Sequence, residues 1–244
     1  MSKFQSRPIK SGSKGFTVIE LLIASSIFAV ILIIITVGII HITQSYTKGV
    51  TETETQNVAR NIVNDITQAI QLNGGDVTLT TYPVTNGNVY GFCIGDREYI
   101  YQVGYEVVSS SQSTLSSHQS YNGLIVNPES GDCPSLTNVS SMSSTFLATK
   151  TLPAGFSELL TPSMRLSYLN VCQGYLSATN GNCTPSSDLT SDLYSIGVQV
   201  TYGDDYVLTS PPTDTNGTTL CAGSAESQFC ATSKLITVVE KRIS

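Results

Sequence analysis

A long apolar segment dominates the N-terminal part of the chain. Residues 21–40 contain no charged side chain, and the next ionic group after them is Lys48. Twenty residues in a helix span about 30 Å, which is the thickness of one bilayer's hydrocarbon core. The segment is longer than the apolar part of a secretory signal peptide, and no small-residue cleavage site follows it. We therefore predict a retained membrane-spanning helix.

The same helix is predicted to continue beyond the membrane segment, so that it covers residues 16–73. Apolar residues recur three and four positions apart, which places them on one helical face. They are Ala59, Ile62, Val63, Ile66, Ala69 and Ile70. The glycine pair Gly74–Gly75 is a typical stop signal for a helix. We interpret the apolar stripe as a core face on which a head domain packs.

Beyond Gly75 the pattern changes to short runs of β-branched and aromatic residues separated by Gly, Pro, Asn and Ser. These runs predict strands at 77–82, 89–94, 99–108, 124–126, 164–171, 194–202 and 235–243, with a turn at Gly95–Asp96. Residues 109–120 are rich in serine and predict a mobile loop, and 203–227 predict a second loop. A long helix followed by an antiparallel sheet is an α+β architecture.

Charge is distributed unevenly along the chain. The whole sequence has 12 basic and 18 acidic residues, but its first fifteen residues carry four basic and no acidic ones. This excess before the apolar helix predicts a cytoplasmic N-terminus and an exported remainder. Only one segment is long enough to span a membrane, which argues against a multi-span protein. The acidic balance argues against a general nucleic-acid binder.

Glu20 stands at the start of the apolar helix, where a carboxylate is costly unless a group pairs with it. Two interpretations remain open from spacing alone. The acid can lie at interface depth, favoured by the helix dipole. Alternatively, it can pair with a positive group in the membrane.

The residues Lys14-Gly15-Phe16-Thr17-Val18-Ile19-Glu20-Leu21-Leu22 resemble the class III leader of type IV prepilins and pseudopilins. The resemblance is strong over about residues 12–45 and weaker to about 73. It implies that prepilin peptidase cuts between Gly15 and Phe16 and that the new N-terminus of Phe16 is methylated. It also implies that Glu20 forms an assembly salt bridge with the amine of a Phe16 in the filament. Removing the leader leaves 8 basic and 18 acidic residues.

The resemblance further implies a pilin-like fold, with a disulfide-pinned β head on the long helix. It divides the chain into a leader at 1–15, a transmembrane and polymerisation helix at 16–40, an amphipathic continuation at 41–73 and an exported head at 74–244. Similarity to larger minor pilins predicts a subunit of a type IV pilus, with roles in pilus biogenesis, adhesion, motility or DNA uptake. The alternatives are a pseudopilin of a type II secretion system and a single-pass membrane-anchored binding module that never polymerises.

The partners implied in this way are other pilin subunits, prepilin peptidase, the inner-membrane assembly platform and membrane lipid. Nucleic acid remains an open partner. The implied location is the inner membrane, with the N-terminus in the cytoplasm, and then a pilus on the cell surface.

Six cysteines lie beyond the apolar segment, on the side predicted to be exported: Cys93, Cys133, Cys172, Cys183, Cys221 and Cys230. An even number there predicts disulfides, although six cysteines allow 15 connectivities. Proximity in sequence favours Cys172–Cys183 and Cys221–Cys230, which leaves Cys93–Cys133. The competing interpretation is a zinc site. It lacks any Cys-x-x-Cys pair, and His41 and His118 are poorly placed to assist, so no metal or cofactor is predicted.

Signals for catalysis are weak, and no catalytic residue is predicted. The sequence has no Gly-x-Ser-x-Gly elbow and no phosphate-binding loop. A Ser–His–Asp triad would need His118 from the serine-rich loop. Asp204 and Asp205 with Asp214 are a candidate calcium site, but an acidic solvated turn is the favoured interpretation. We therefore expect a structural protein rather than an enzyme.

Overall fold

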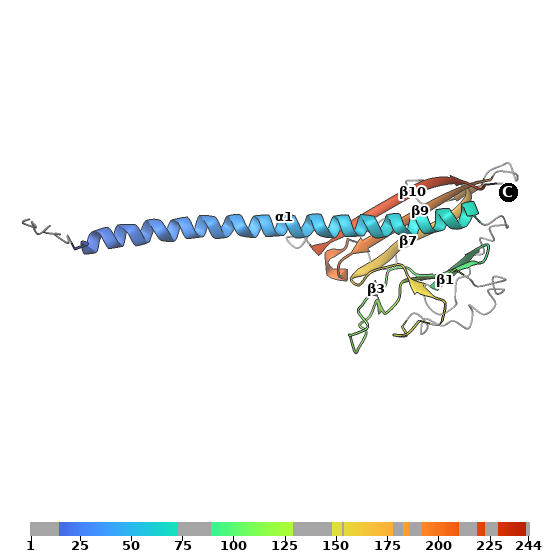
Figure 1. Ribbon diagram of the computed structural model, residues 1–244, viewed down its shortest axis with the longest axis horizontal. Helices are drawn as coiled ribbons and strands as arrows, with labels where there is room; N and C mark the ends of the chain where they lie inside the picture. Colours follow the sequence, from blue (N-terminus) through green and yellow to red (C-terminus); the bar gives the residue numbers. More distant parts are fainter. Residues whose placement is uncertain are drawn as a thin grey trace, which may run out of the picture. The chain divides into compact units, whose positions relative to one another are not determined.

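The structure is a computed structural model that describes residues 15–72, 89–128, 148–152, 154–177, 183–185, 192–209, 219–222 and 229–242. It divides into two compact units, Met1–Ser45 and Tyr46–Ser244. The elements, in chain order, are α1 (Val18–Leu72), β1 (Val89–Ile94), β2 (Arg97–Gln102), β3 (Glu106–Val107), β4 (Gln119–Ser120), β5 (Leu124–Asn127), β6 (Ser157–Glu158), β7 (Met164–Leu176), β8 (Cys183–Pro185), β9 (Leu193–Tyr202), the 3-10 turn η2 (Asp205–Val207) and β10 (Ala231–Glu240) (Figure 1). The α+β class expected from the sequence is confirmed.

Helix α1 begins two residues later and ends one residue earlier than predicted. It is continuous, consistent with the absence of proline from its sequence. All six members of the predicted apolar stripe are at most 9% exposed. Thr51 and Thr55 extend the buried face toward the N-terminus, and each donates its hydroxyl to the carbonyl four residues earlier. The prediction of a core face is therefore confirmed.

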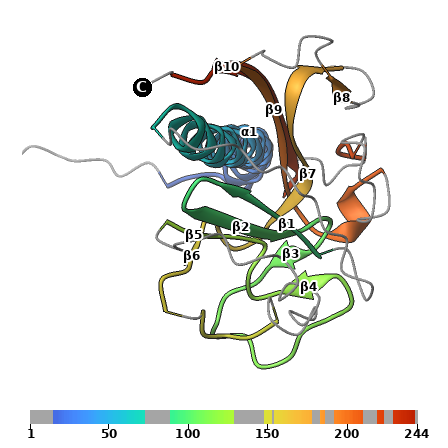
Figure 2. The same ribbon diagram turned by 90° about the vertical axis from the view of Figure 1, so that its right-hand side faces the viewer.

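Two sheets pack against this face. One has the strand order β1-β2-β5-β6, and the other has the order β10-β9-β7-β3-β4, with β8 attached to β7. Figure 2 looks nearly along α1 and shows β7, β9 and β10 curving past one side of the helix, with β1 and β2 on another. Side chains from α1 and from both sheets share one hydrophobic core. The helix therefore joins the two sheets into one head.

The predicted strands agree with the structure best where the alternation is long. β1 has the predicted bounds and is joined to β2 by the predicted turn, whereas β7 runs five residues further than expected. The predicted run 99–108 is split into β2 and β3, because Gly104 adopts a left-handed φ of 85° between them. β10 covers 231–240 rather than 235–243. The predicted strand 77–82 lies outside the described residues.

Three short strands, β4, β6 and β8, were not predicted, since two or three residues carry no visible alternation. β4 ends the serine-rich segment and pairs in parallel with β3. Hydrogen bonds also form within that segment. In one of them, Gln112 N donates to Ser109 O at 2.9 Å. In the other predicted loop, η2 and a bridge between Leu208 and Cys221 are formed. Both predicted loops therefore contain regular structure.

A polar tie connects α1 to the first sheet. Asp65 accepts a hydrogen bond from Arg97 Nη1 at 2.7 Å and another from the Tyr99 hydroxyl at 2.8 Å. Burial, together with the neighbouring Asp65 carboxylate, raises the pKa of Tyr99. The tyrosine therefore stays protonated and remains a donor.

Glu158 in β6 is a largely buried carboxyl group in the first sheet. Its oxygens accept hydrogen bonds from the backbone N–H groups of Gly123, Leu124 and Leu160 at 2.7, 3.0 and 2.8 Å. Burial raises the pKa of Glu158 to about 7 from an ordinary value of 4.5, and these hydrogen bonds oppose the rise. Near neutral pH the group is therefore partly protonated.

This raised pKa predicts a pH-dependent stability of the head. Between pH 4.5 and about 7, the folded state retains a proton that the unfolded state releases. The stabilisation is therefore complete below that range and is lost as the pH rises through 7, by about 1–3 kcal/mol. The variant Glu158→Gln has no such proton, so its unfolding free energy is expected to change less between about pH 5 and pH 8. Urea unfolding at several pH values measures this. An unfolding free energy that changes equally with pH in variant and wild type would contradict it.

Candidate functional site

The start of α1 carries the charged group that the sequence singled out. Thr17 N donates to Glu20 Oε2 at 3.0 Å, and Thr17 Oγ1 donates to the same oxygen at 2.9 Å. In return, Glu20 N donates to Thr17 Oγ1 at 3.3 Å. This reciprocal pattern is a capping box, which satisfies backbone donors at a helix N-terminus. The sequence signature Thr-x-x-Glu was present at these positions and could have predicted it.

The capping box leaves part of the Glu20 carboxylate available. Both hydrogen bonds reach Oε2, so Oε1 has no partner among the residues that the structure describes. Gly15 and Phe16 precede the helix, and Phe16 is 81% exposed. Glu20 thus lies five residues after Gly15 and four after Phe16. Its carboxylate can accept a hydrogen bond from a further donor.

Hydroxyl side chains within and just beyond the apolar segment are satisfied by the helix itself. Ser25, Ser26, Thr36 and Thr43 donate their hydroxyls to carbonyls three or four residues earlier, at 2.7–3.0 Å. Such bonds let hydroxyl groups reside in hydrocarbon without an unpaired donor. These residues therefore do not oppose insertion into a membrane.

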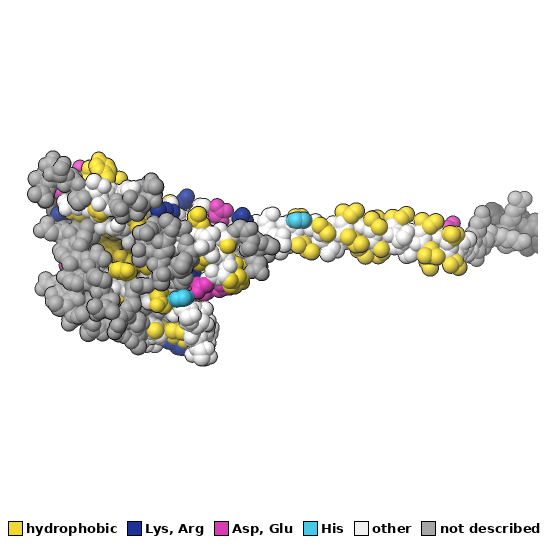
Figure 3. Space-filling model, turned by 180° about the vertical axis from the view of Figure 1, so that it is seen from behind, with side chains coloured by type: hydrophobic (Ala, Val, Ile, Leu, Met, Phe, Trp, Pro, Cys, Tyr) yellow, Lys and Arg dark blue, Asp and Glu magenta, His cyan; other side chains and the backbone are white. Residues whose placement is uncertain are grey.

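The first unit exposes an unusual amount of apolar surface. The most apolar window of α1 has a mean hydropathy of 2.9 and none of it is buried, and α1 is long and apolar enough to cross a membrane. Leu21, Phe28 and Ile34 are each more than 60% exposed. Figure 3 shows hydrophobic side chains along the visible side of this part of the helix. A monomer in water would not retain such a surface, so it must be covered by lipid or protein.

In the head, Arg165 of β7 forms a buried ionic cluster. Its side chain is 1% exposed and donates to the carbonyls of Gly104 and Gly203 at 3.2 and 2.8 Å. It also forms an ion pair with Asp205 and lies 3.9 Å from the Glu106 carboxylate. The cluster joins β3, β7 and the turn after β9. The cluster was not predicted from the sequence, although an arginine inside a predicted strand was a visible signal.

Asp205 links this cluster to His118, because its Oδ2 lies 3.0 Å from His118 Nδ1. Burial alone would raise the pKa of Asp205, but the hydrogen bonds from Arg165 and His118 bring it below its ordinary value. Burial raises the pKa of Glu106, although a hydrogen bond from Gln119 opposes the rise. His118 adopts a left-handed φ of 65° near the end of the serine-rich segment, and its ring is held by the contact with Asp205.

The contacts of Asp205 concern the candidate calcium site that the sequence offers at Asp204, Asp205 and Asp214. Asp205 is occupied by Arg165 and His118, and Asp214 lies outside the described residues. Within the described ranges, no group of three or more His, Cys, Asp or Glu side chains is arranged to hold a metal ion. The acidic turn therefore serves a structural contact through Asp205.

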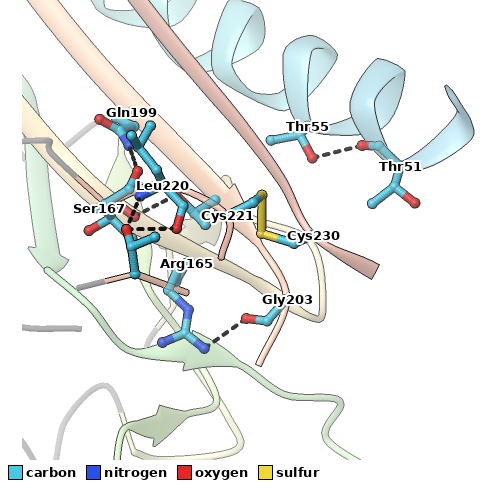
Figure 4. The surroundings of a disulfide bond; sticks show 12 residues. Thr51, Thr55, Arg165, Ser167, Gln199, Gly203, Leu220, Cys221 and Cys230 are labelled. Carbon is cyan, nitrogen blue, oxygen red and sulfur yellow. Dashed lines mark hydrogen bonds between the residues drawn. A yellow bond between two sulfur atoms is a disulfide. The ribbon is translucent and has the colours of Figure 1, made fainter. Parts of the chain in front are cut away.

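The structure has disulfides between Cys172 and Cys183 and between Cys221 and Cys230, with Cα–Cα distances of 6.0 and 5.7 Å. The first connects β7 to β8. The second lies beside the Thr51–Thr55 turn of α1, close to Arg165 and Gly203 (Figure 4). Cys93 is buried in β1, but its expected partner Cys133 lies outside the described residues.

Residues 10–36 match the prokaryotic N-terminal methylation motif. This range includes the junction at Gly15 and Phe16, the capping box and most of the apolar segment. No curated protein and no solved structure shows significant similarity to the chain. The motif supports a type IV pilin-like or pseudopilin precursor, and it implies processing by prepilin peptidase and assembly with other pilins. It likewise implies a structural subunit and fits anchoring in a membrane.

Proposed function

We propose that the chain is a minor pilin-like subunit of a type IV pilus, assembled through its N-terminal helix. The observation that carries the proposal is one continuous arrangement at the matched motif. A basic segment leads to Gly15 and Phe16, then to a capped helix whose apolar segment 21–40 is exposed and is preceded by one carboxylate, Glu20. A subunit stored in lipid and later packed among the helices of other pilins requires these features together.

Hydrolysis of the Gly15–Phe16 peptide bond removes the basic leader and creates a primary amine at Phe16. Methylation of that amine leaves it protonated at neutral pH, so the new terminus is a cation. The unoccupied Oε1 of Glu20 can accept a hydrogen bond from such a cation while Oε2 stays in the capping box. In the filament this salt bridge neutralises a charge that would otherwise be buried among apolar helices.

The division of labour along the chain follows from this proposal. Residues 1–15 are the leader, 16–40 the transmembrane and polymerisation helix, 41–73 its amphipathic continuation and 74–244 the exported head. The precursor resides in the inner membrane with its N-terminus in the cytoplasm, where it meets the peptidase, lipid and the assembly platform. The mature subunit then joins a surface pilus that serves adhesion, motility or DNA uptake.

A pseudopilin of a type II secretion system is the second candidate, because the matched motif is common to both kinds of precursor. A membrane-anchored binding module that never polymerises is the third. It would leave the exposed apolar helix covered by lipid alone.

The mature N-terminus tests the proposal. We expect mass spectrometry of the chain from sheared surface filaments to find N-methylated Phe16 as the first residue. Recovery with a secretion complex, and absence from pili, would favour the pseudopilin. An intact leader beginning at Met1 would contradict assembly altogether.

A further inference from the structure

The second unit has two opposite ends, which are defined by the directions of α1 and β10. Ala231 at the start of β10 shares a cavity with Lys48 and Glu52 of α1. Beyond the end of β10, Arg242 shares another cavity with Gln71 near the end of α1. The two elements thus run side by side in the same direction. The rise per residue of a helix and of a strand gives about 30 Å between these ends along either element.

An aromatic and acidic pocket lies at the end of the head where β10 begins, which we call the near end. The pocket has a volume of about 270 Å³ and is lined by Tyr202, Tyr206, Phe229 and Asp204, among others. Tyr206 is 66% exposed and Phe229 is 48% exposed. The Asp204 side chain is exposed and makes no capping hydrogen bond to η2.

The backbone beneath the near-end pocket is held in place. Gly203 has a φ of 120°, and a Cβ there would lie 2.8 Å from Phe229 O and from Val207 Cγ2. The carbonyl of Gly203 accepts a hydrogen bond from the buried Arg165, and Phe229 precedes the disulfide-bonded Cys230. The rings and the carboxylate are therefore presented by a rigid frame, which reduces the entropy lost on binding.

The other end, which we call the far end, carries two basic side chains beside the acidic Glu240. Lys241 and Arg242 follow β10 and line an open cavity of about 480 Å³ together with Gln71 and Glu240. Arg242 is exposed, and within the described part of the chain neither cation forms an ion pair. The backbone of Lys241 is fixed to the head because its backbone N–H donates to Asp192 O at 2.8 Å. Two positive side chains are thus presented where β10 ends.

We propose that the near-end pocket of one copy receives Lys241 and Arg242 from the far end of a second copy. Asp204 would supply the opposite charge, and the rings of Tyr206 and Phe229 would supply cation–π contacts. Because the near end and the far end are opposite ends of the same head, a contact between them joins two copies that point in the same direction. The contact is head-to-tail and joins two copies that are neighbours in a filament. It rests on the proposed function as a filament subunit.

Charge reversal in the full-length chain tests this contact. We expect Asp204→Lys, and separately Lys241→Glu with Arg242→Glu, to lower the fraction of the chain in sheared filaments at least about threefold. Combining all three changes is expected to restore part of that fraction, because the charges are then exchanged although the cation–π contacts stay lost. Asp96→Lys in the turn between β1 and β2 makes the same charge change at a residue that lines neither cavity, and it is the matched control.

The outcomes separate the two proposals. Absence of the wild-type chain from filaments would contradict the proposed function. Wild-type incorporation with no effect of Asp204→Lys, or a combined variant no better than its parents, would overturn the head-to-tail contact alone.

A second measurement avoids any effect of charge reversal on folding. A photo-crosslinking amino acid at position 206 is expected to join a peptide that contains Arg242 from another copy. Crosslinks only to a different protein, or none between copies, would overturn the proposal.

Discussion

Replacing Glu20 with alanine is expected to leave leader removal intact and to reduce incorporation into filaments by about 100-fold or more. The reason is that the variant leaves the cationic terminus of Phe16 without a partner among apolar helices. Removing one member of a buried ion pair costs about 3–5 kcal/mol, and each 1.4 kcal/mol is a factor of ten. The measurement is the ratio of processed protein in sheared filaments to processed protein in the membrane. Equal ratios for variant and wild type would refute the salt bridge.

Two further variants separate charge from helix capping. Glu20→Gln keeps an oxygen for the Thr17 N–H, as glutamine does in capping boxes, but removes the charge. It is therefore expected to fail in assembly nearly as much as alanine. Thr17→Ala removes the hydroxyl contact and keeps the charge, so its effect should be near 1 kcal/mol, about fivefold. The reverse order, with glutamine active and Thr17→Ala inactive, would assign Glu20 to capping alone.

The sequence was sufficient for the helix because its pattern is local and long. The stripe from Ala59 to Ile70 repeats over three turns, so its spacing alone predicts that every member lies on the buried face. The same holds for β1, whose alternation ends at the tight turn Gly95–Asp96. Such signals depend only on neighbours within a few residues, and they do not require knowledge of the partner surface.

The buried ionic cluster of Arg165 could not be predicted from such local patterns. Arg165 meets the carbonyls of Gly104 and Gly203, which are 61 and 38 residues away in the sequence. A residue-by-residue pattern contains no information about contacts at such separations. β10 begins four residues earlier than predicted for a similar reason. Its pairing of Ala231 with Tyr202 is set by the partner strand and the disulfide at Cys230.

The near-end pocket depends both on a local sequence pattern and on contacts between residues far apart in the sequence. Gly203 and the aspartates after it read as an ordinary turn, and their chemistry changes only because Phe229 is brought beside them from 26 residues later. The cluster under the turn explains why it is rigid. The stability of the head and the presentation of the pocket thus depend on one buried cation.

Replacing Arg165 with methionine is accordingly expected to destabilise the head by about 3–5 kcal/mol near neutral pH. Methionine fills much of the space, but Glu106 is then left as a buried carboxylate without its cation, and two carbonyls lose their donor. Asp205→Asn is the matched control. Asp205 is 42% exposed and Arg165 keeps its other partners, so a loss near 1 kcal/mol is expected. Urea unfolding of the full-length chain in detergent, followed by the near-ultraviolet signal of its tyrosines, measures both.

The pH dependence identifies the mechanism of that loss. Burial already raises the pKa of Glu106, and removing Arg165 takes away an opposing attraction, so the pKa rises further. A carboxyl group whose folded-state pKa is raised gives its full stabilisation below the unfolded value and loses it as the pH rises through the folded value. Arg165→Met should therefore recover stability as the pH is lowered toward 5, and Arg165→Met with Glu106→Gln should be more stable than Arg165→Met alone at pH 7, by about 1–3 kcal/mol. If the two variants are equally unstable at every pH, the loss comes from the unsatisfied carbonyls and from packing, and the buried charge of Glu106 is not its cause.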